Sequence, residues 1–454
     1  MDQAGLLQDA ARRALAYLEG RNARAVMPDA AAVTRLGGFD VPLPAGPSDP
    51  MATLALLDDL VSPATLVETG PRFFGFVIGG VLPAALAANW LAASWDQNAA
   101  YYSTTPGVAH AEKTALAWLI GLFDLPADTA AGFVTGATVA NFTALAAARH
   151  WVLERAGWNV EADGLFGAPP ITVITGGEAH PTLLKSLGML GLGRSRVVRA
   201  RVDAQGCMRA DALPEIQGPA ILCLQAGNVN TGGFDPFHPL IERAHAQGAW
   251  VHVDGAFGLW AKVVPALRPL VEGLELADSW ATDAHKWLNV PYDCGLAFVR
   301  YEAALRGAMA ITAEYLPTDT SIRNPSDYAP ELSRRARGVE VWAALHSLGR
   351  SGLTEMIERN CRQARRFAAG LAAAGYRVLN EVVLNQVLVA FGDAARTREV
   401  VQAIQAEGTC WCGITVWQGQ TAMRISVCNW STTDDDVELS LAAMLRVAAR
   451  QPAS

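Results

Sequence analysis

The sequence predicts an α/β fold in which a mainly parallel, seven-stranded sheet is covered by helices. Short apolar, β-rich runs recur between about residues 130 and 300, and helical patterns such as 139–157 and 237–247 fall between several of them. Runs that lack polar alternation indicate strands buried on both faces, as in parallel sheets. The runs are 132–136, 171–177, 197–202, 220–227, 250–254, 279–283 and 294–300.

The regions outside this sheet have different patterns. Residues 1–65 hold helical segments separated by a Pro/Gly-rich stretch, and we expect them to pack on another domain or subunit because they cannot bury their own apolar faces. Residues 66–305 form the predicted large domain. Residues 306–454 contain a polar stretch, a long helix from about 340 to 374, and then short strands mixed with helices. This last pattern predicts a smaller C-terminal α+β domain.

Composition narrows the possible partners. Of the 454 residues, 51% are hydrophobic and only 18% are charged, where an average soluble domain has roughly 25%; part of the surface is therefore expected to be buried in an oligomer. The net charge of −8 argues against a nucleic acid or an anionic membrane as partner. The uncharged stretch 73–95 is interrupted by glycines and Pro83, and its continuous helical part is too short to span a bilayer.

Several familiar chemistries are not indicated. The seven cysteines include no CxxC pair, and no cluster has metal-ligand spacing, which predicts no metal site and reduced thiols in a cytoplasmic protein. The N-terminal helix carries acids and lacks the basic and apolar regions of a signal peptide. Dinucleotide, Walker A and G-x-S-x-G fingerprints are absent.

The chain has only four lysines, so any lysine chemistry must use one of Lys113, Lys185, Lys262 and Lys286. Lys286 comes just after the predicted strand that ends at Asp283, between a histidine and a tryptophan. A lysine in so apolar a segment is unusual on a surface, although a snorkelling lysine would give the same pattern.

Three further features stand at the ends of predicted strands. Asp254 ends the run 250–254, where ligands bind in α/β sheets, and an acid there can keep a ring nitrogen protonated; alternatively it caps a helix. Residues 136–141 join a strand to a helix through small residues, so their N–H groups can hold an anion, although an ordinary turn looks alike. His180 follows the run 171–177, and a lone loop histidine is more often structural.

Together these features fit pyridoxal phosphate (PLP). This cofactor needs an amine, an acid for its ring nitrogen, donors for its phosphate and a flat group against its ring. Lys286, Asp254, residues 136–141 and His180 supply one of each, and each follows a different predicted strand.

Eight short motifs match one known family. They are PRFFGF (71–76), TGATVAN (135–141), GGEAH (176–180), GNVNTGGFDP (227–236), HVDGAFG (252–258), DAHKW (283–287), SRRARG (333–338) and MRISVCNW (423–430). On these motifs the chain resembles the group II PLP-dependent decarboxylases of fold type I, the relatives of aromatic-amino-acid, histidine and glutamate decarboxylases. The resemblance covers about residues 70–440, and the H-K-W triplet with H-V-D upstream is highly specific.

The resemblance implies a role for each matching residue. Lys286 corresponds to the Schiff-base lysine, Asp254 to the partner of the ring nitrogen, and His180 to the histidine that stacks on the ring. Phe76 and Tyr101 fall where the family lines its substrate pocket, from both subunits of a homodimer. The other implied cofactor contacts are Ala137, Thr138, Ala256 and His285.

The segment near 312–332 corresponds to the catalytic loop of the family. Residues 318–328 are polar, contain Pro325 and lack apolar periodicity, so we expect them to be weakly ordered. Tyr328 is the best match to the tyrosine that directs the reaction, and Tyr315 is a second candidate.

The implied function is PLP-dependent decarboxylation of an L-amino acid to its amine and CO2, with His180 or Tyr328 returning a proton to the α-carbon. Aromatic residues around Phe76 and Tyr101 suggest an aromatic or bulky substrate, although aromatic core residues would look the same. Oxidative deamination to an aldehyde, or carbon–carbon lyase chemistry, is the alternative on the same scaffold. A catalytically silent binding protein is a further alternative, against which the presence of both Lys286 and Asp254 argues.

Overall fold

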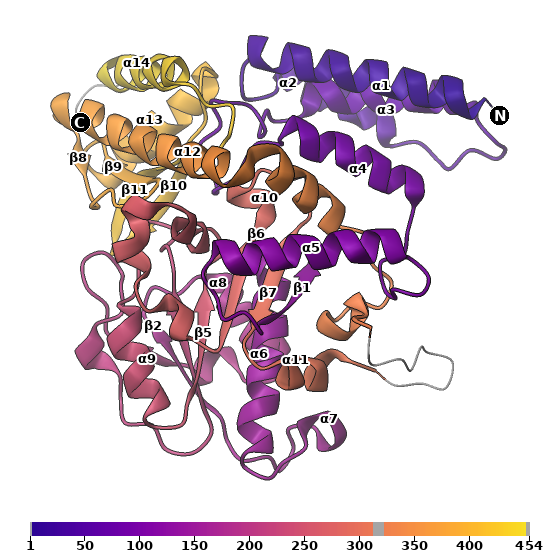
Figure 1. Ribbon diagram of the computed structural model, residues 1–454. Coiled ribbons are helices and arrows are strands. Elements are labelled where there is room, and N and C mark those ends of the chain that lie inside the picture. Colours follow the sequence, from indigo (N-terminus) through magenta and orange to yellow (C-terminus); the bar gives the residue numbers. More distant parts are fainter. Residues whose placement is uncertain (1, 312–321, 451–454) are drawn as a thin grey trace. The chain divides into compact units, whose positions relative to one another are not determined.

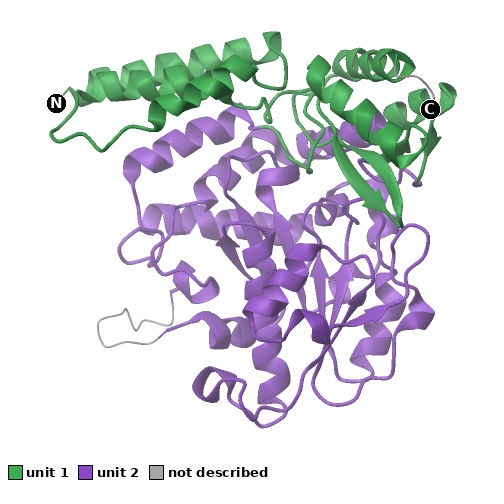
Figure 2. Ribbon diagram, turned by 180° about the vertical axis from the view of Figure 1, so that it is seen from behind, with its two compact units in different colours: residues 1–80, 366–379, 387–454 green, residues 81–365, 380–386 purple. Residues whose placement is uncertain are grey.

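The computed structural model describes residues 2–311 and 322–450 of the chain (Figure 1). The chain divides into two compact units, coloured separately in Figure 2. The large unit comprises residues 81–365 and 380–386, and the small unit comprises 1–80, 366–379 and 387–454. The division differs from the predicted boundaries, because residues 306–365 belong to the unit with the sheet and residues 1–80 belong with the C-terminal region.

The large unit is built on a seven-stranded sheet, as predicted. The strand order is β1-β7-β6-β5-β4-β2-β3, and β7 runs antiparallel to both β1 and β6 while the other paired strands are parallel. The strands are β1 (Ala130–Val134), β2 (Thr172–Gly176), β3 (Val198–Ala200), β4 (Ala220–Gln225), β5 (Trp250–Asp254), β6 (Ser279–Asp283) and β7 (Gly295–Val299). All seven predicted runs are therefore strands.

The helices of the large unit lie mostly between these strands. They are α4 (Pro83–Trp95), α5 (Pro106–Leu122), α6 (Ala137–Glu154), α7 (Val160–Asp163), α8 (Pro181–Met189), α9 (Phe237–His245), α10 (Ala284–Trp287) and α11 (Glu302–Met309). The long helix α12 spans Gly338–Ala373, close to the predicted 340–374, and is interrupted at Gly349, whose φ of 59° is not helical.

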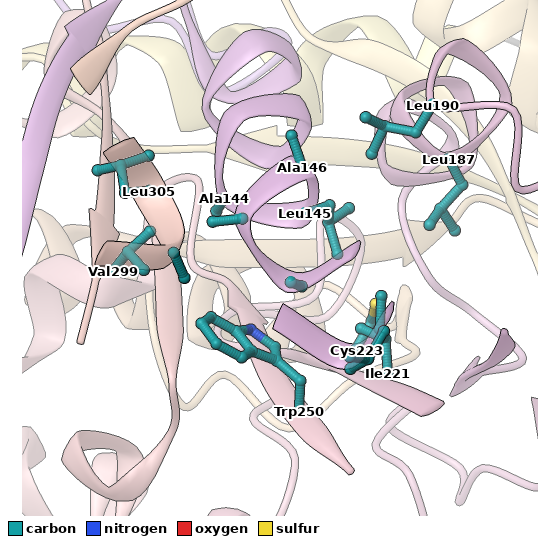
Figure 3. Packing of buried hydrophobic residues seen from close by; sticks show 14 of the residues in the cluster. Ala144, Leu145, Ala146, Leu187, Leu190, Ile221, Cys223, Trp250, Val299 and Leu305 are labelled. Carbon is teal, nitrogen blue, oxygen red and sulfur yellow. The ribbon is translucent and has the colours of Figure 1, made fainter. Parts of the chain in front are cut away.

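Helix α6 covers one face of the sheet and contacts β1, β4, β5, β6 and β7. The buried residues of α6 that face the sheet recur at helical spacing. Many of them are alanine, whose small side chain lets the helix approach the strands closely. Figure 3 shows Ala144 and Leu145 of this helix beside Trp250 of β5, in one buried cluster with Val299. Phe298, which precedes Val299 on β7, packs instead on Phe123, the residue that follows α5, and the two ring centroids are 5.8 Å apart. Because strand side chains alternate, α6 and the end of α5 lie on opposite faces.

The small unit combines N-terminal helices with an antiparallel sheet. Its sheet order is β10-β11-β9-β8, and the mixture of short strands and helices agrees with the predicted α+β pattern. Arg13 of α1 pairs with Asp58 of α3 at 3.0 Å, so the N-terminal helices pack on each other. The elements are α1 (Gln3–Gly20), α2 (Ala30–Arg35), α3 (Pro50–Ala64), β8 (Arg377–Val378), β9 (Gln386–Ala390), α13 (Ala394–Glu407), β10 (Gly413–Trp417), β11 (Gln420–Ser426) and α14 (Asp434–Arg450). No helix within the described ranges is long and apolar enough to cross a membrane.

Candidate active site

The candidate site lies at one edge of the large sheet. Because β1, β2, β4, β5 and β6 run in the same direction, their carboxyl ends meet at this edge. Asp254 ends β5, Asp283 ends β6, and His180 follows β2. Lys286 lies in the single turn of α10 that begins directly after β6. This is the edge at which α/β sheets bind their ligands.

Asp254 is a buried carboxylate with only 4% of its surface exposed. One carboxylate oxygen accepts a hydrogen bond from the Asn141 side-chain amide at 3.2 Å, and the other accepts the backbone N–H of Ala256 at 3.2 Å. Burial raises the pKa of Asp254 above its ordinary value, while the nearby His180 and Lys286 act in the opposite direction. A cation placed against this carboxylate would lower its pKa again, as the charged nitrogen of a pyridine ring does.

The Lys286 amine is held by a carboxylate of its own. Its Nζ lies 3.1 Å from Asp283 Oδ2, and 6.0 Å from the ring centroid of Phe257. The Lys286 side chain is 19% exposed, so the amine is partly enclosed but reachable from outside. The backbone of Asp283 is fixed in turn, because its carbonyl accepts the indole N–H of Trp260 at 3.0 Å.

The first turn of α6 forms an anion cradle beside the lysine. The backbone N–H of Ala137 donates to Asp283 Oδ1 at 2.6 Å, and His285 Nε2 lies 3.5 Å from the same oxygen. Burial lowers the pKa of His285, and its Nδ1 accepts the Cys294 N–H at 3.1 Å, so Nε2 carries the ring proton. The two donors thus converge on the negative charge of the Asp283 carboxylate, and groups of this kind could also hold the oxygens of a phosphate.

Close backbone contacts keep this cradle free of side chains. A Cβ on Gly295 would lie 2.5 Å from the backbone of Gly136, and a Cβ on Gly136 would lie 3.2 Å from the His285 ring. Glycine is therefore required where β7 passes the start of α6. Thr138 belongs to the same first turn, and its carbonyl accepts the Ser186 hydroxyl of α8 at 2.8 Å.

His180 is the N-cap residue of α8. Its Nδ1 accepts the backbone N–H of Thr182 at 3.3 Å and contacts the Thr182 hydroxyl at 2.6 Å. A backbone N–H can only donate, so His180 presents a protonated Nε2 on the other side of its ring. The loop after β4 lies nearby in the fold, where Asn228 Nδ2 donates to the carbonyl of Glu178 at 3.3 Å.

Two predicted site residues, Phe76 and Tyr101, are not brought to Lys286 by these contacts. Phe76 belongs to the small unit, where its ring stacks on Trp411 at 5.4 Å. Tyr101 lies in a segment tied to residues 322–328, since the neighbouring Tyr102 N–H donates to Asn324 at 3.2 Å. Tyr315 lies outside the described residues.

Tyr328 is placed at the opposite end of the strands. It is 5% exposed, its hydroxyl donates to Glu302 just beyond β7, and the Arg323 guanidinium lies 4.4 Å above its ring. The predicted weak order does not hold for residues 322–328, because Arg323 donates to Glu112 and to the Ala131 carbonyl. This arrangement does not support Tyr328 as the proton donor; residues 318–321 lie outside the described part of the chain.

Sequence reasoning missed three residues that shape the site. Asp283 was noted only as a strand end, and Asn141 only as part of a turn, yet both contact predicted site residues directly. His252 is fully buried and binds Asn141 at 2.8 Å. One signal was available in the sequence, because Trp250, His252 and Asp254 alternate along β5 and must therefore share a face.

Comparison with known proteins gives one family. Residues 47–392 match the pyridoxal-dependent decarboxylase conserved domain. Tryptophan decarboxylase 1 of Oryza sativa subsp. japonica is 26% identical over 415 residues, which cover 83% of this chain and 80% of that protein. L-2,4-diaminobutyrate decarboxylase of Rhizobium meliloti (strain 1021) is 28% identical over 381 residues, covering 79% and 74%.

A solved structure has the same fold. The crystal structure of Oryza sativa TDC with PLP and tryptamine superposes with a TM-score of 0.91 at 22% identity, covering 99% of this chain and 98% of that chain. The site fits PLP on two observations: a buried carboxylate that calls for a cationic partner, and donors that converge on an anion beside Lys286. The chain therefore belongs to the pyridoxal-dependent decarboxylase family and is a PLP-dependent amino-acid decarboxylase.

Proposed function

We propose that this enzyme decarboxylates an L-amino acid with an aromatic or other bulky side chain and releases the amine, with Lys286, Asp254 and His180 as its catalytic centre. The observation that carries the assignment is the placement of a buried carboxylate and a partly enclosed amine at one sheet edge. When bound, PLP supplies an aldehyde that reacts with amines and a ring that accepts the electron pair left by departing CO2.

The residues of the chain divide the remaining tasks. Lys286 would hold the cofactor through its side-chain amine, and Asp283, whose carboxylate lies 3.1 Å from that amine, would orient it. Asp254 offers a fixed negative charge to the ring nitrogen, and its two hydrogen bonds hold both oxygens in place. Ala137, Thr138 and His285 would hold the phosphate at the start of α6, and Ala256 and His180 would contact the cofactor ring.

The proton that replaces CO2 must reach the substrate α-carbon. His180 lies on the proposed donor path, and its Nε2–H could hydrogen-bond the group that delivers the proton, because its Nδ1 is engaged by the Thr182 N–H. Tyr315 is the remaining candidate for the loop tyrosine, since Tyr328 binds Glu302 instead. Return of this proton gives the amine, whereas release of an aldehyde and ammonia instead would require molecular oxygen as a two-electron oxidant and water.

Support for a bulky substrate comes from relatives and from the small unit. The rice relative is named for tryptophan. Phe76 is 59% exposed and stacks on Trp411, which stacks on Phe73 at 5.0 Å, so an aromatic face is available for contact. Phe76 has a φ of 52°, a region that non-glycine residues rarely adopt and that is enriched at functional sites.

We propose further that the enzyme is a homodimer whose active site lies at the interface, and exposed apolar surface on the small unit supports the dimer. The small unit has an apolar groove along α1 and α3, and Leu7, Leu43 and Leu57 are 57%, 93% and 51% exposed. Obligate dimers bury more than about 2,000 Å² of such surface. A fully active monomer in sedimentation at micromolar concentration would contradict the assembly.

The free cysteines support a cytoplasmic location.

Borohydride trapping tests the proposal directly. Reduction of the holoenzyme should fix the cofactor on Lys286, as peptide mapping would show, and Lys286→Ala should lose turnover by several orders of magnitude. Lys185→Ala, which removes an exposed lysine of α8, is the matched control. A panel of aromatic, acidic and diamino acids, assayed for CO2, amine and aldehyde, identifies the substrate. An adduct on Lys113, Lys185 or Lys262, or none at all, would overturn the assignment.

A further inference from the structure

A line of buried hydrogen bonds leads through the large unit to Asp254. Trp250, His252 and Asp254 lie on the face of β5 that α6 covers, because they occupy alternate strand positions. Ser279 is paired with His252 on the neighbouring strand β6. Asn141 lies in the first turns of α6 and is fully buried, as are Trp250, Ser279 and His252.

The distances join these side chains in one series. Trp250 Nε1 lies 2.8 Å from Ser279 Oγ, which lies 2.9 Å from His252 Nδ1. His252 Nε2 lies 2.8 Å from Asn141 Oδ1, and Asn141 Nδ2 lies 3.2 Å from Asp254 Oδ2. Four hydrogen bonds therefore connect an indole in the core with the carboxylate at the sheet edge.

The chemistry of the two ends gives the series a direction. The Trp250 indole can only donate, so the Ser279 hydroxyl accepts from it and has its own proton free for His252 Nδ1. The His252 proton is then on Nε2 and is donated to the Asn141 carbonyl oxygen, which turns the Asn141 amide toward Asp254. Burial lowers the pKa of His252 to about 3, so the ring stays neutral and keeps this tautomer.

We propose that Asn141, His252 and Ser279 are positioning residues that hold Asp254 ionised and correctly oriented for the cofactor ring nitrogen. A reversed Asn141 amide would point its carbonyl oxygen at the carboxylate, and the series prevents that reversal. Asp254 therefore receives one donor on each oxygen, from Asn141 and from the Ala256 backbone. The proposal rests on the role proposed above for Asp254.

The ordinary explanation is that buried polar groups simply satisfy each other and stabilise the core. The two explanations differ in one observable, the protonation of the ring nitrogen in the holoenzyme. Asn141→Leu removes the donor to Asp254 at similar volume. Ser279→Ala leaves every group that touches Asp254 in place and removes only the hydroxyl that sets the His252 tautomer.

The experiment combines these variants with PLP labelled with ¹⁵N at the ring nitrogen. In Asn141→Leu the ¹⁵N signal should move toward the unprotonated position, and the PLP dissociation constant should rise about ten-fold, as expected for one hydrogen bond to a charged group. In Ser279→Ala both changes should have the same sign, with an increase of about three-fold, since the loss acts through an intermediate. Ser440→Ala and Thr143→Ala, which remove buried hydroxyls bonded within their own helices, should change neither.

The results distinguish failure of the positioning role from failure of the role proposed for Asp254 itself. If both variants keep the ring nitrogen protonated and bind PLP as the controls do, the positioning role is overturned, whatever happens to stability. If Asn141→Leu fails to fold, Ser279→Ala decides alone. Asp254→Asn is measured in parallel, and a ring nitrogen that stays protonated there would refute the role of Asp254 itself. A His252 ring protonated on Nδ1 in ¹⁵N spectra of the holoenzyme would also overturn the inferred direction.

Discussion

The buried ion cluster around Glu112 provides a stability prediction that can be worked from the structure. Glu112 of α5 is 1% exposed, and its carboxylate lies 3.1 Å from the fully buried Arg334 and 3.2 Å from Arg323. Arg334 also donates to the carbonyls of Ala99 and Phe133 at 3.2 and 2.8 Å. The cluster therefore ties the segment that carries Tyr101 to β1.

Glu112→Gln keeps the shape of the side chain but removes the carboxylate charge that pairs with both guanidinium groups. Removing one partner of a buried pair costs about 3–5 kcal/mol, and we expect about 3 kcal/mol because the amide oxygen still accepts one hydrogen bond. Two-state unfolding is not assured in a chain with two units, so the assay is amide hydrogen exchange in peptides covering residues 98–122. Local opening should accelerate exchange there by about 100-fold.

A second substitution tests the cause. In Glu112→Gln combined with Arg334→Met, the more deeply buried of the two guanidinium charges is gone, so exchange should be slower than in the single variant. The control is Glu355→Gln, which breaks an ion pair with Arg359 on the surface of one helix. It should change the free energy of local opening by about 0.5 kcal/mol or less. Exchange within about two-fold of wild type in Glu112→Gln, or a double variant less stable than the single one, would refute the reasoning.

Four further predictions concern the candidate site residues and their neighbours. Asp254→Asn should fold but lose about two orders of magnitude or more in kcat, as expected when a preorganised electrostatic partner is neutralised; near wild-type turnover would contradict this. Tyr328→Phe should lower the free energy of unfolding by about 1 kcal/mol, because it loses the hydrogen bond to Glu302 and water can replace the tyrosine at this exposed carboxylate. The product should remain the amine. Tyr315→Phe should raise the aldehyde fraction, and the reverse result would restore Tyr328. The pKa of His252 is lowered to about 3 in the folded state, so its stabilising contribution is present above about pH 6.5 and is lost as pH falls toward 3, by about 1.4 kcal/mol per unit; His252→Gln should show a flatter acid limb.

The strands and the strand-end residues were predictable because their signals are local. Apolar runs without alternation mark strands buried on both faces, and a strand end marks the edge where Asp254 and Lys286 stand. The bonds that orient these residues join segments far apart in the chain: Asn141 and His252 are 111 residues apart, and Ala137 and Asp283 are 146 apart. No local pattern identifies such partners.

The same limit explains the error at residues 322–328. Their polarity and Pro325 predict a loose loop, but the partners that bury Arg323 and Asn324 are Glu112 of α5 and the backbone N–H of Tyr102. A polar segment is exposed only when its charges lack buried counterparts, and those counterparts lie more than 200 residues earlier in the chain.

Strand β5 links the chemistry mechanically to the core. Its rise places Asp254 about 13 Å from Trp250 along one face, and Trp250 packs on Trp151 of α6 at a ring-centroid distance of 5.4 Å. A change at Trp151 would let the indole of Trp250 tilt, which would disturb Ser279 first and the ionised carboxylate last. Substitutions at Trp151, whose partner Trp250 lies at the opposite end of β5 from Asp254, should therefore weaken cofactor retention even though they touch none of the residues that would bind it.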